Sequence, residues 1–432
     1  MKQAIKIKLL DIKSIPMRTF HMSWFAFFLC FFGWFAIPAL SPWIMESLNI
    51  TKAQFVTTSQ WAVGSTIIMR LVTGWLCDKI GPRVTYGWML FLGSIPVAMS
   101  GLINSYESLL IVRILVGAIG ASFVITQYHT TKMFAPNIVG TANATSAGWG
   151  NFGGGATQKG MPLLLLAFAF FMPEEEAWRW AMLVPAVLMV FTGIAYLKFT
   201  KDTPEGNFKD IDRVITKTEG SFKSAVSDYR VWLLVIIYGS CFGVELLINS
   251  NMVIYLTEDL KVDKVLAGSI AALFGFMNLF ARTMGGKFSD KIAGSKGLNG
   301  RVKWLFITLF LESLTLMYFS QAKTLIVLIP ALIAFSVCVQ MSSGATFSIV
   351  PFINKKALGA IAGLVGAGGN LGAVLGMELF KIEGFSWDNA FLYLGAIVFV
   401  VSFIALGIRF SQSDEERVKK ELDLINAKVN AI

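Results

Sequence analysis

Charged side chains are scarce in this sequence of 432 residues. Only 15% of the residues are Asp, Glu, Lys or Arg, whereas 55% are hydrophobic, and the mean hydropathy is +0.65. A water-soluble domain cannot bury so much apolar surface, because its surface grows too fast relative to its volume. A lipid bilayer accepts such surface, so the composition excludes a soluble protein and indicates one embedded in a membrane.

Cysteine is also rare, and no pattern of reactive residues stands out. The four cysteines, Cys30, Cys77, Cys241 and Cys338, lie far apart in or at apolar stretches. Their spacing predicts neither a disulfide framework nor a metal site. No nucleophile, base and orienting residue occur together in a recognisable motif, so we expect no enzymatic activity and no cofactor. The first apolar stretch lacks a small-residue cleavage site, which is typical of a retained span and not of a signal peptide.

Apolar stretches of about 20 residues recur along the chain, the length that a helix needs to cross a bilayer. We therefore expect an all-α membrane protein with about twelve transmembrane helices. They are predicted over 19–40, 55–77, 84–103, 108–131, 138–171, 180–199, 231–256, 264–288, 303–321, 325–349, 357–381 and 389–410.

A polar segment at 200–230 divides these spans into two groups of six. The predicted organisation is an N-terminal bundle over 1–199, a linker over 200–230, a C-terminal bundle over 231–410 and a tail over 411–432. The tail changes from acidic (Asp414) to basic (Lys420), which favours a short, solvated amphipathic helix.

Lysine and arginine are unevenly distributed between successive loops. They gather before the first span, after the second (Lys79, Arg83), within 200–230, after the eighth span and in the tail, whereas 104–107 has none and another loop carries Glu174–Glu176. This positive-inside asymmetry predicts that both termini and the linker are cytoplasmic in a multi-pass protein of the plasma (inner) membrane. It also accounts for the net charge of +10 without a nucleic-acid partner.

Two short patterns occur once in each half. Arg70, Gly74, Asp78 and Lys79 are repeated with identical spacing as Arg282, Gly286, Asp290 and Lys291, 212 residues later. Gly150, Asn151 and Gly153 are repeated as Gly369, Asn370 and Gly372, 219 residues later. Because six spans is an even number, both halves have one orientation. We expect two pseudo-symmetric six-helix bundles related by an axis along the membrane normal.

The repeated arginines lie deep in the membrane. Each is eight residues before the aspartate that ends its span, about 12 Å deeper along a helix. A charge near the midplane costs roughly 2.5–3.5 kcal/mol, so it must face protein or water and needs a partner.

Two interpretations of these arginines remain open. In the structural one they form ion pairs, for which the candidates are Glu245 and Glu312, the latter in a span that we expect at the periphery. The first six spans contain no acidic residue, so Arg70 has no acidic partner in its own half. In the functional one Arg70 and Arg282 together bind an anionic substrate, since the flat guanidinium matches a planar oxyanion.

Other polar residues within the spans carry weaker predictions. For Arg113 a structural or gating role and contact with a ligand both remain open, and His129 is expected to be a histidine satisfied by neighbours. The many glycines of spans five and eleven favour close helix packing. An intramembrane amide needs a hydrogen-bond partner. For Asn151 that partner is a ligand or another helix, and for Asn370 we favour packing.

Two groups of motifs resemble a known family. The run Gly74-x-x-x-Asp78-Lys79-x-Gly81-x-Arg83 resembles the loop motif after the second span of the major facilitator superfamily, and its echo at Gly286 and Asp290 departs from it, with Gly294 one place late. AGWGNFGGGATQ (147–158) and GAGGNLGAVLG (366–376) resemble the two signatures of the nitrate/nitrite porter family within that superfamily. The resemblance spans nearly the whole chain and implies the major facilitator fold.

The resemblance also implies roles for particular residues. In that family one arginine from span two and one from span eight bind nitrate, which correspond here to Arg70 and Arg282. The signature asparagine corresponds to Asn151. The aromatic residues that sandwich the ion correspond to Phe123 and Phe242, for which ordinary packing is the alternative. A substrate-contacting tyrosine corresponds to Tyr238. The gating or structural motif comprises Gly74, Asp78, Gly81, Arg83, Gly286 and Asp290.

We therefore expect a secondary active transporter of nitrate, and of nitrite, that works by alternating access as a monomer. Moving a monovalent anion into a negative cell interior costs about 2.3 kcal/mol per 100 mV, so uptake must be coupled to protons or to anion exchange. Glu245 lies near mid-membrane and is the candidate proton carrier, although it could instead neutralise an arginine. The alternatives are a carrier of organic anions, such as sugar phosphates or carboxylates, and a non-transporting membrane sensor.

Overall fold

The computed structural model describes residues 3–210, 221–354, 357–382 and 384–430. Of the linker predicted over 200–230, residues 211–220 lie outside these ranges. Within them the chain is all-α and has no strand, with only two isolated bridges, Ala4–Phe134 and Thr203–Gly206.

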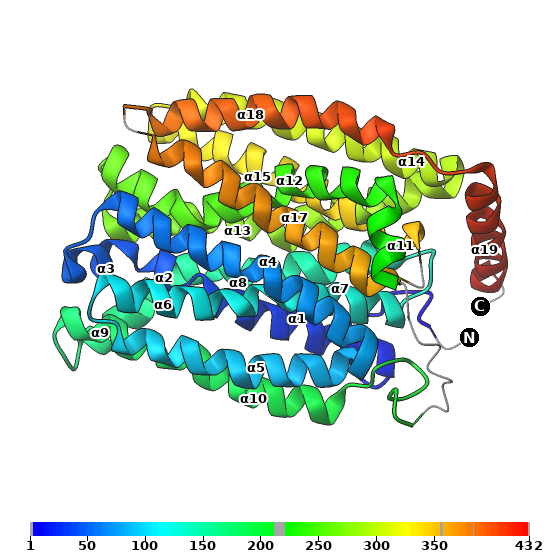
Figure 1. The fold of residues 1–432 in the computed structure, drawn as a ribbon, viewed down its shortest axis with the longest axis horizontal. Helices are drawn as coiled ribbons and strands as arrows, with labels where there is room; N and C mark the ends of the chain where they lie inside the picture. The colour runs from blue at the N-terminus through cyan, green and yellow to red at the C-terminus, as the bar shows by residue number, and fades with distance from the viewer. Residues whose placement is uncertain (1–2, 211–220, 355–356, 383, 431–432) are drawn as a thin grey trace.

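The helices before the linker, here called the N-half, lie side by side in the lower part of Figure 1. They are α1 Ile15–Trp34, α2 Ala36–Ala39, α3 Ser41–Leu48, α4 Lys52–Ile80, α5 Pro82–Met99, α6 Tyr106–Gly117, α7 Ser122–Met133, α8 Val139–Ala169, α9 Glu174–Ala181 and α10 Leu183–Phe199.

The helices after the linker form the upper part of Figure 1. The C-half consists of α12 Tyr229–Ile254, α13 Lys264–Phe276, α14 Ala281–Ser320, α15 Leu325–Phe347, α16 Val350–Ile353, α17 Leu358–Glu378 and α18 Trp387–Ile404. Two further helices, α11 Ser221–Ser227 and α19 Gln412–Asn430, flank it.

Each of the twelve predicted spans falls on helical residues. By length and apolarity, eight helical stretches of the described chain can cross a membrane, and the longest, Lys264–Ser320, contains two predicted spans. The three other predicted spans, over 19–40, 55–77 and 138–171, are also long helices, but their polar residues and glycines make them less apolar.

The outward faces of the helices are apolar. On α10 the exposed side chains include Val187, Phe191 and Ile194, and on α18 they include Ile397 and Val400. Water would not favour so many exposed large apolar groups, whereas lipid accepts them. Helices satisfy their backbone groups internally, which is the condition for spanning hydrocarbon.

Helices of the two halves cross at close range where glycines leave no side chain between the backbones. A Cβ added at Gly74 of α4 would lie 2.6 Å from the carbonyl oxygen of Gly359 in α17. One added at Gly286 of α14 would lie 2.5 Å from the carbonyl oxygen of Gly140 in α8. These equivalent crossings bring the halves into backbone contact near the chain termini, as the small-residue packing of membrane helices allows.

The same crossings hold the two motif aspartates against the opposite half. Asp290 of α14 accepts hydrogen bonds from the backbone N–H and the hydroxyl of Thr141, both at 2.6 Å, at the start of α8. It also pairs with Arg301 at 2.7 Å. Asp78 of α4 lies beside Gly359 at the start of α17. A carboxylate is favoured at a helix N-terminus, so each aspartate stabilises contact between halves.

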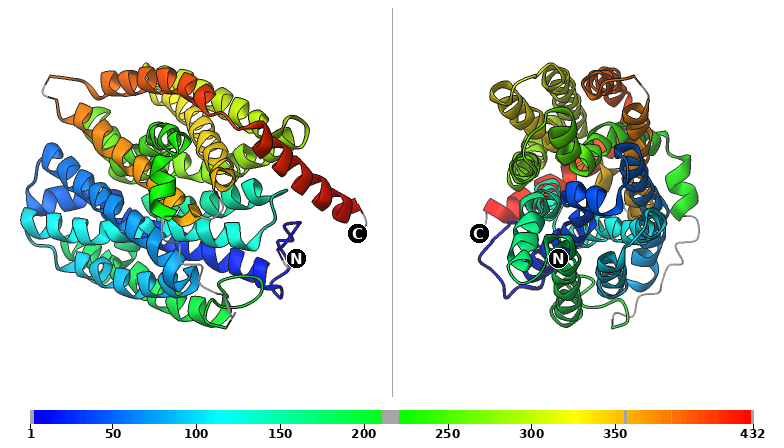
Figure 2. Two further views of the ribbon diagram at one scale, coloured as in Figure 1. Left: turned by 45° about the vertical axis from the view of Figure 1, so that its right-hand side comes forward. Right: turned by 90° about the vertical axis from the view of Figure 1, so that its left-hand side faces the viewer.

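Both chain termini lie at one end of the bundle, here called the terminal end, and α19 lies across it (Figures 1 and 2). α14 reverses at Gly297, whose φ of 63° favours glycine. The Glu415 carboxylate of α19 accepts from the N–H groups of Leu298 and Asn299, each at 2.8 Å. Val418 packs against Val139 and Phe352, so the predicted tail helix is docked on both halves.

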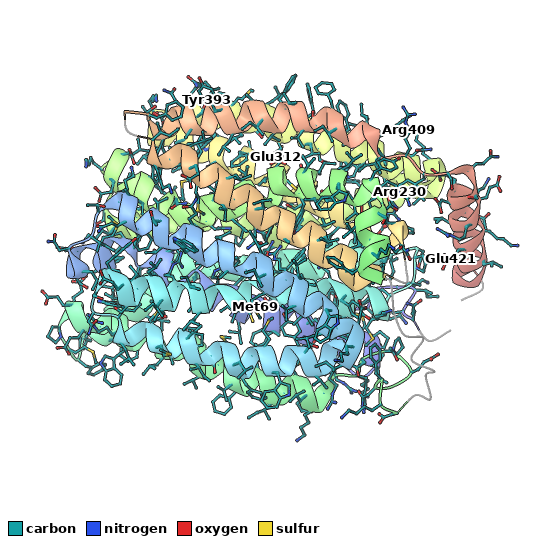
Figure 3. All side chains as sticks on the ribbon, in the orientation of Figure 1. Met69, Arg230, Glu312, Tyr393, Arg409 and Glu421 are labelled. Atoms are coloured by element: carbon teal, nitrogen blue, oxygen red, sulfur yellow. The ribbon has the colours of Figure 1, made fainter. Side chains whose placement is uncertain are left out.

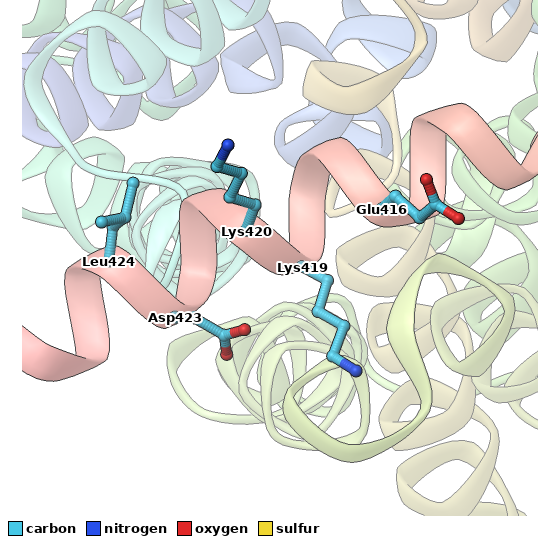
Figure 4. Close-up of a pocket in the computed structure, with 5 residues that line it drawn as sticks. All are labelled: Glu416, Lys419, Lys420, Asp423 and Leu424. Carbon is cyan, nitrogen blue, oxygen red and sulfur yellow. The ribbon is translucent and has the colours of Figure 1, made fainter.

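The outer surface of α19 carries charges of both signs. Glu416, Lys419, Lys420 and Asp423 project from it in Figure 4. With Leu424 these residues line a shallow pocket that is open to solvent, and all of them belong to α19.

The opposite end of the bundle, here called the far end, is also closed by contacts between halves. Lys52 at the start of α4 pairs with Asp259 after α12 and lies over the Trp387 ring. Lys264 at the start of α13 pairs with Glu46 of α3. Gln60 of α4 donates to the Val374 carbonyl of α17 at 3.0 Å.

Candidate functional site

Arg282 lies at the start of α14 and is fully buried. Its Nη1 donates to Oε2 of Glu245 at 3.0 Å and lies 3.5 Å from Oε1 of Gln340. Its Nη2 donates to the Tyr238 hydroxyl at 2.8 Å. The ion-pair interpretation therefore holds for Arg282, whose partner is one of the two predicted carboxylates.

Glu245 of α12 is the centre of a hydrogen-bond network between the halves. Besides Arg282, its carboxylate accepts from Nδ2 of Asn151 at 3.1 Å and from Nδ2 of Asn278 at 3.2 Å. All of these residues are buried. Asn151 belongs to α8 of the N-half, so this carboxylate joins the two halves directly.

Arg70 of α4 is equally buried but has a different environment. It donates to the carbonyl oxygens of Gly366 in α17 and Gly120 before α7. Its Nε has no partner in the described chain, and no carboxylate there pairs with Arg70. The expectation that Arg70 has no acidic partner in its own half is confirmed for the described residues.

Two phenylalanine rings lie beside both guanidinium groups. The Cζ atom of Arg70 is 5.2 Å from the centre of the Phe123 ring and 4.9 Å from that of Phe242. For Arg282 the distances are 5.7 Å and 5.5 Å. These are cation–π distances. The two ring centres are 5.6 Å apart and their planes differ by 22°.

Tyr238 and Phe347 complete the aromatic cluster. The Tyr238 ring stacks on Phe242, with 4.8 Å between centres and 7° between planes. Phe347 of α15 meets Phe123 edge-on at 4.7 Å. Phe123, Tyr238 and Phe242 are fully buried in this cluster, so none of them faces lipid.

The structure thus brings together all six residues predicted for substrate binding, together with Glu245. Sequence reasoning missed Asn278, Gln340 and Phe347. A signal existed for Asn278, which precedes Arg282 by four residues, the spacing of one helix face. No sequence signal pointed to Gln340 or Phe347, because their helix, α15, contains neither of the repeated motifs.

The other polar residues within the spans have local partners. His129 contacts the Tyr196 hydroxyl and the Lys201 carbonyl, both at 2.7 Å, so the prediction of a satisfied histidine is confirmed. Arg113 donates to Ser59 at 2.8 Å and to the carbonyl of Trp34, the last residue of α1. The negative end of that helix compensates its charge. Asn370 donates to the Val63 carbonyl at 2.9 Å, an interhelical bond.

Glu312 lies in the span that we expected at the periphery, but its side chain faces inward. The second arm of α14 exposes Ile307, Leu311 and Leu314, whereas Glu312 on its inner face is fully buried. α14 reverses at Gly297, and its second arm faces α15 and not only lipid. The apolarity of the span could not distinguish a side chain that faces lipid from one that faces the protein interior.

The loop motif after α4 is fixed by one carboxylate. Asp202 accepts from the N–H groups of Arg83 at 2.9 Å and Phe208 at 3.1 Å, and it lies against Gly81, whose φ is 91°. Burial raises the pKa of Asp202, while these two N–H groups act in the opposite direction. The Arg83 side chain donates to the Leu197 carbonyl at 2.9 Å.

The charge balance of this centre favours an anion over a cation. With Glu245 ionised, Arg70, Arg282 and Glu245 carry one net positive charge in a buried place, and protonation of Glu245 would make it two. An unpaired buried cation is costly, so an anion that contacts Arg70 would be stabilised there.

Comparison with known sequences gives the relatives of this chain. The Major Facilitator Superfamily profile matches residues 23–377, with a second match over 247–431. The chain is 34% identical over 420 residues to the high affinity nitrate transporter 2.7 of Arabidopsis thaliana, covering 93% of this chain and 85% of that protein. It is 27% identical over 441 residues to the nitrate/nitrite transporter NrtP of Nostoc punctiforme, covering 84% and 87%.

Solved structures show the same fold at low sequence identity. The human organic anion transporter MFSD10 matches with a TM-score of 0.64 and 14% identity, covering 90% of this chain and 99% of that one. A bacterial homologue of the human lysosomal transporter Spinster matches with a TM-score of 0.60 and 14% identity, covering 93% and 99%.

Proposed function

Because this chain belongs to the nitrate/nitrite porter family of the major facilitator superfamily, we propose that it carries nitrate, and also nitrite, across the membrane by alternating access. Arg70 and Arg282 bind the anion, with Asn151, Tyr238, Phe123 and Phe242 around it. The terminal end is cytoplasmic in the plasma (inner) membrane, and the protein acts as a monomer.

The observation that carries this proposal is the unequal pairing of the two arginines. In the described chain the hydrogen bonds of Arg70 go only to carbonyl oxygens, whereas Arg282 is held by Glu245 at 3.0 Å. An anion arriving between them gives Arg70 a counter-charge and competes with Glu245 for Arg282. The guanidinium fork offers two parallel N–H groups to a planar oxyanion, which a lysine ammonium cannot do.

The ring geometry favours a small and flat substrate. Two rings that hold a planar ion between them need centres about 7 Å apart, twice a van der Waals contact distance. Phe123 and Phe242 are 5.6 Å apart, so nitrate requires only a small separation of the rings. A sugar phosphate would require the aromatic cluster to open much further.

Competition for Arg282 also supports proton coupling. Protonation of Glu245 removes the charge that competes with the anion, so a proton and nitrate bind together. Their sum is neutral, and its inward movement avoids the cost of about 2.3 kcal/mol per 100 mV for the anion alone. Anion exchange, which needs no proton, is the alternative form of coupling.

The test is nitrate uptake into proteoliposomes under imposed pH and voltage gradients, for the wild type and Arg70→Lys. We expect a loss of roughly tenfold or more in uptake by Arg70→Lys, since one bidentate charge-assisted contact is worth about 1.5–3 kcal/mol. Arg417→Lys, which changes an exposed arginine of α19, is the matched control and should transport normally.

Full nitrate uptake by Arg70→Lys would exclude the bidentate site. Added chloride, phosphate, nitrite and a small carboxylate would identify the substrate class by competition, and only nitrite should compete strongly. Uptake that ignores the pH gradient but requires internal nitrite would indicate exchange in place of proton coupling.

A further inference from the structure

Glu312 is a fully buried carboxyl group outside the site described above. It lies in the second arm of α14, and Figure 3 shows it midway along the bundle. Neither of its carboxyl oxygens has a hydrogen-bond partner in the described chain. A carboxylate in such a place would be costly, because burial in an apolar surrounding disfavours the charged form.

No cation is available to neutralise it. The two buried arginines of the C-half are both engaged, Arg282 by Glu245 at 3.0 Å and Arg301 by Asp290 at 2.7 Å. On α18, which packs against this arm, the titratable groups are Asp388, engaged by Lys323 and by Tyr255 at the far end, and the exposed Tyr393. A neutral, protonated Glu312 would avoid the cost of a buried charge.

The groups that face Glu312 connect it to the anion site. Glu245 and Cys241 of α12 lie close enough to interact with it electrostatically, and Cys338 of α15 does so as well. Ser342 of α15 lies next to its carboxyl, although the Ser342 hydroxyl donates to the Cys338 carbonyl at 3.1 Å.

α15 also carries polar residues near Glu245 and near Cys241. Gln340 lies beside Glu245 and Arg282, and Ser343 follows it one turn later, beside Cys241. Nε2 of Gln340 and Oγ of Ser343 are buried and have no partner in the described residues. Polar groups are costly within a membrane, and ionisable residues buried there mark ion pathways and proton relays.

From these contacts we propose that Glu312 is a second proton-carrying residue, which exchanges its proton with Glu245 along the Gln340–Ser343 face of α15. In the step the O–H bond of Glu312 breaks and an O–H bond forms on Glu245, which releases Arg282 for the anion, and Glu312 regains a proton from water on the side from which the anion enters. When the protein opens to the other side and the anion leaves, the O–H bond of Glu245 breaks and its proton passes to water, so one proton crosses with each anion. This inference rests on the proposed function, because it assumes that Glu245 takes part in coupling.

The first test is the variant Glu312→Gln, which keeps the shape of the neutral acid but cannot release a proton. Proton influx driven by nitrate should fall by about a hundredfold, the usual contribution of a positioned acid or base. Nitrate/nitrate counterflow requires no net proton movement, and at a pH low enough for Glu245 to take its proton directly from water it should remain near the wild-type rate. A purely structural role would leave both rates unchanged, and that result would overturn the inference.

A spectroscopic measurement tests the protonation state independently of transport. Infrared spectra of the wild-type protein in vesicles should contain the C=O band of a buried protonated carboxylic acid at neutral pH, and Glu312→Gln should lack it. An identical band in both proteins would also overturn the inference. If the wild type shows no proton-driven uptake at all, the proposed coupling fails, whereas a wild-type response that Glu312→Gln retains refutes only the role of Glu312.

Discussion

At the residue scale, Glu245 and the two arginines have unequal contacts that pseudo-symmetry alone would not produce. Arg70 and Arg282 occupy equivalent positions of the repeat, yet only Arg282 has a carboxylate. Breaking a buried ion pair by removing one partner costs about 3–5 kcal/mol, because the remaining charge is left uncompensated. The pair is therefore a strong contact in the closed state and a natural competitor of an incoming anion.

This competition predicts the response of Glu245→Gln to nitrate. Without nitrate the variant should unfold at a lower temperature, since Arg282 loses its counter-charge. Added nitrate should raise its unfolding temperature more than that of the wild type, because a ligand stabilises in proportion to its affinity for the native state. Thermal unfolding in detergent, with and without nitrate, measures both effects.

Glu107→Gln is the matched control, because Glu107 is an exposed carboxylate at the far end. It should behave like the wild type in both conditions. If Glu245→Gln gains no more from nitrate than this control does, the anion does not compete with Glu245.

At the element scale, the halves meet through paired helix crossings with no room for side chains. α14 crosses α8 at Gly286 and Gly140, and α4 crosses α17 at Gly74 and Gly359. Glycine lets backbones approach closely, and here the approach also brings Asp290 and Asp78 to the first turns of the opposite helices. Closure of the terminal end therefore depends on backbone shape as well as on charge.

We predict that Gly286→Ala loses most nitrate uptake while Gly294→Ala keeps it. A methyl group at 286 would come within 2.5 Å of the Gly140 carbonyl oxygen, whereas nothing lies within 4 Å of one at 294. Overpacking of this kind costs about 1–3 kcal/mol, and here it would destabilise the closed state. Uptake into proteoliposomes compares the two variants.

The substitution Ser348→Cys, at a residue buried beside Gly140, would report the same closure. Alkylation of the introduced cysteine by a membrane-impermeant reagent from the terminal side should speed up in the Gly286→Ala background. Equal transport and equal alkylation in the two glycine variants would mean that this crossing does not control the terminal end.

At the scale of the whole molecule, both ends of the path are closed in one structure. The far end is held by exposed ion pairs, Lys52–Asp259 and Lys264–Glu46, and the terminal end by the buried contacts of Asp290. A hydrogen bond and the charge of Lys264 lower the pKa of Glu46. The contribution of that pair is therefore present at neutral pH and is lost only as pH falls through the lowered value.

The exposed ion pairs should stabilise the closed far end only weakly. Lys52→Gln should increase the reactivity of a cysteine placed between the halves at that end by a few fold, since an exposed pair contributes about 0.2–1 kcal/mol. Lys323→Gln breaks a similar pair with Asp388 inside the C-half and should have no effect. Added salt should reduce the difference. Equal reactivity in both variants would show that this contact does not hold the far end shut.

Much of the architecture follows from the chain alone, because hydrophobic length and the spacing of repeats are one-dimensional properties. Each predicted span lies on helical residues. The equal spacing of each repeated arginine, eight positions before its aspartate, predicted their common depth, and the lack of acids in the first six spans predicted that Arg70 has no carboxylate in its own half. Glu245 and Glu312 were recognisable as intramembrane acids for the same reason.

The tertiary structure alone decided which of those acids meets which arginine. Depth along a helix does not determine the direction that a side chain takes around it, and that direction depends on how the helices pack. Packing turned Glu245 toward Arg282, Asn151 and Asn278, and it brought Phe123 and Phe242 beside both guanidinium groups. It also placed Glu312 in the protein interior, since α14 reverses at Gly297 and lays its second arm against α15.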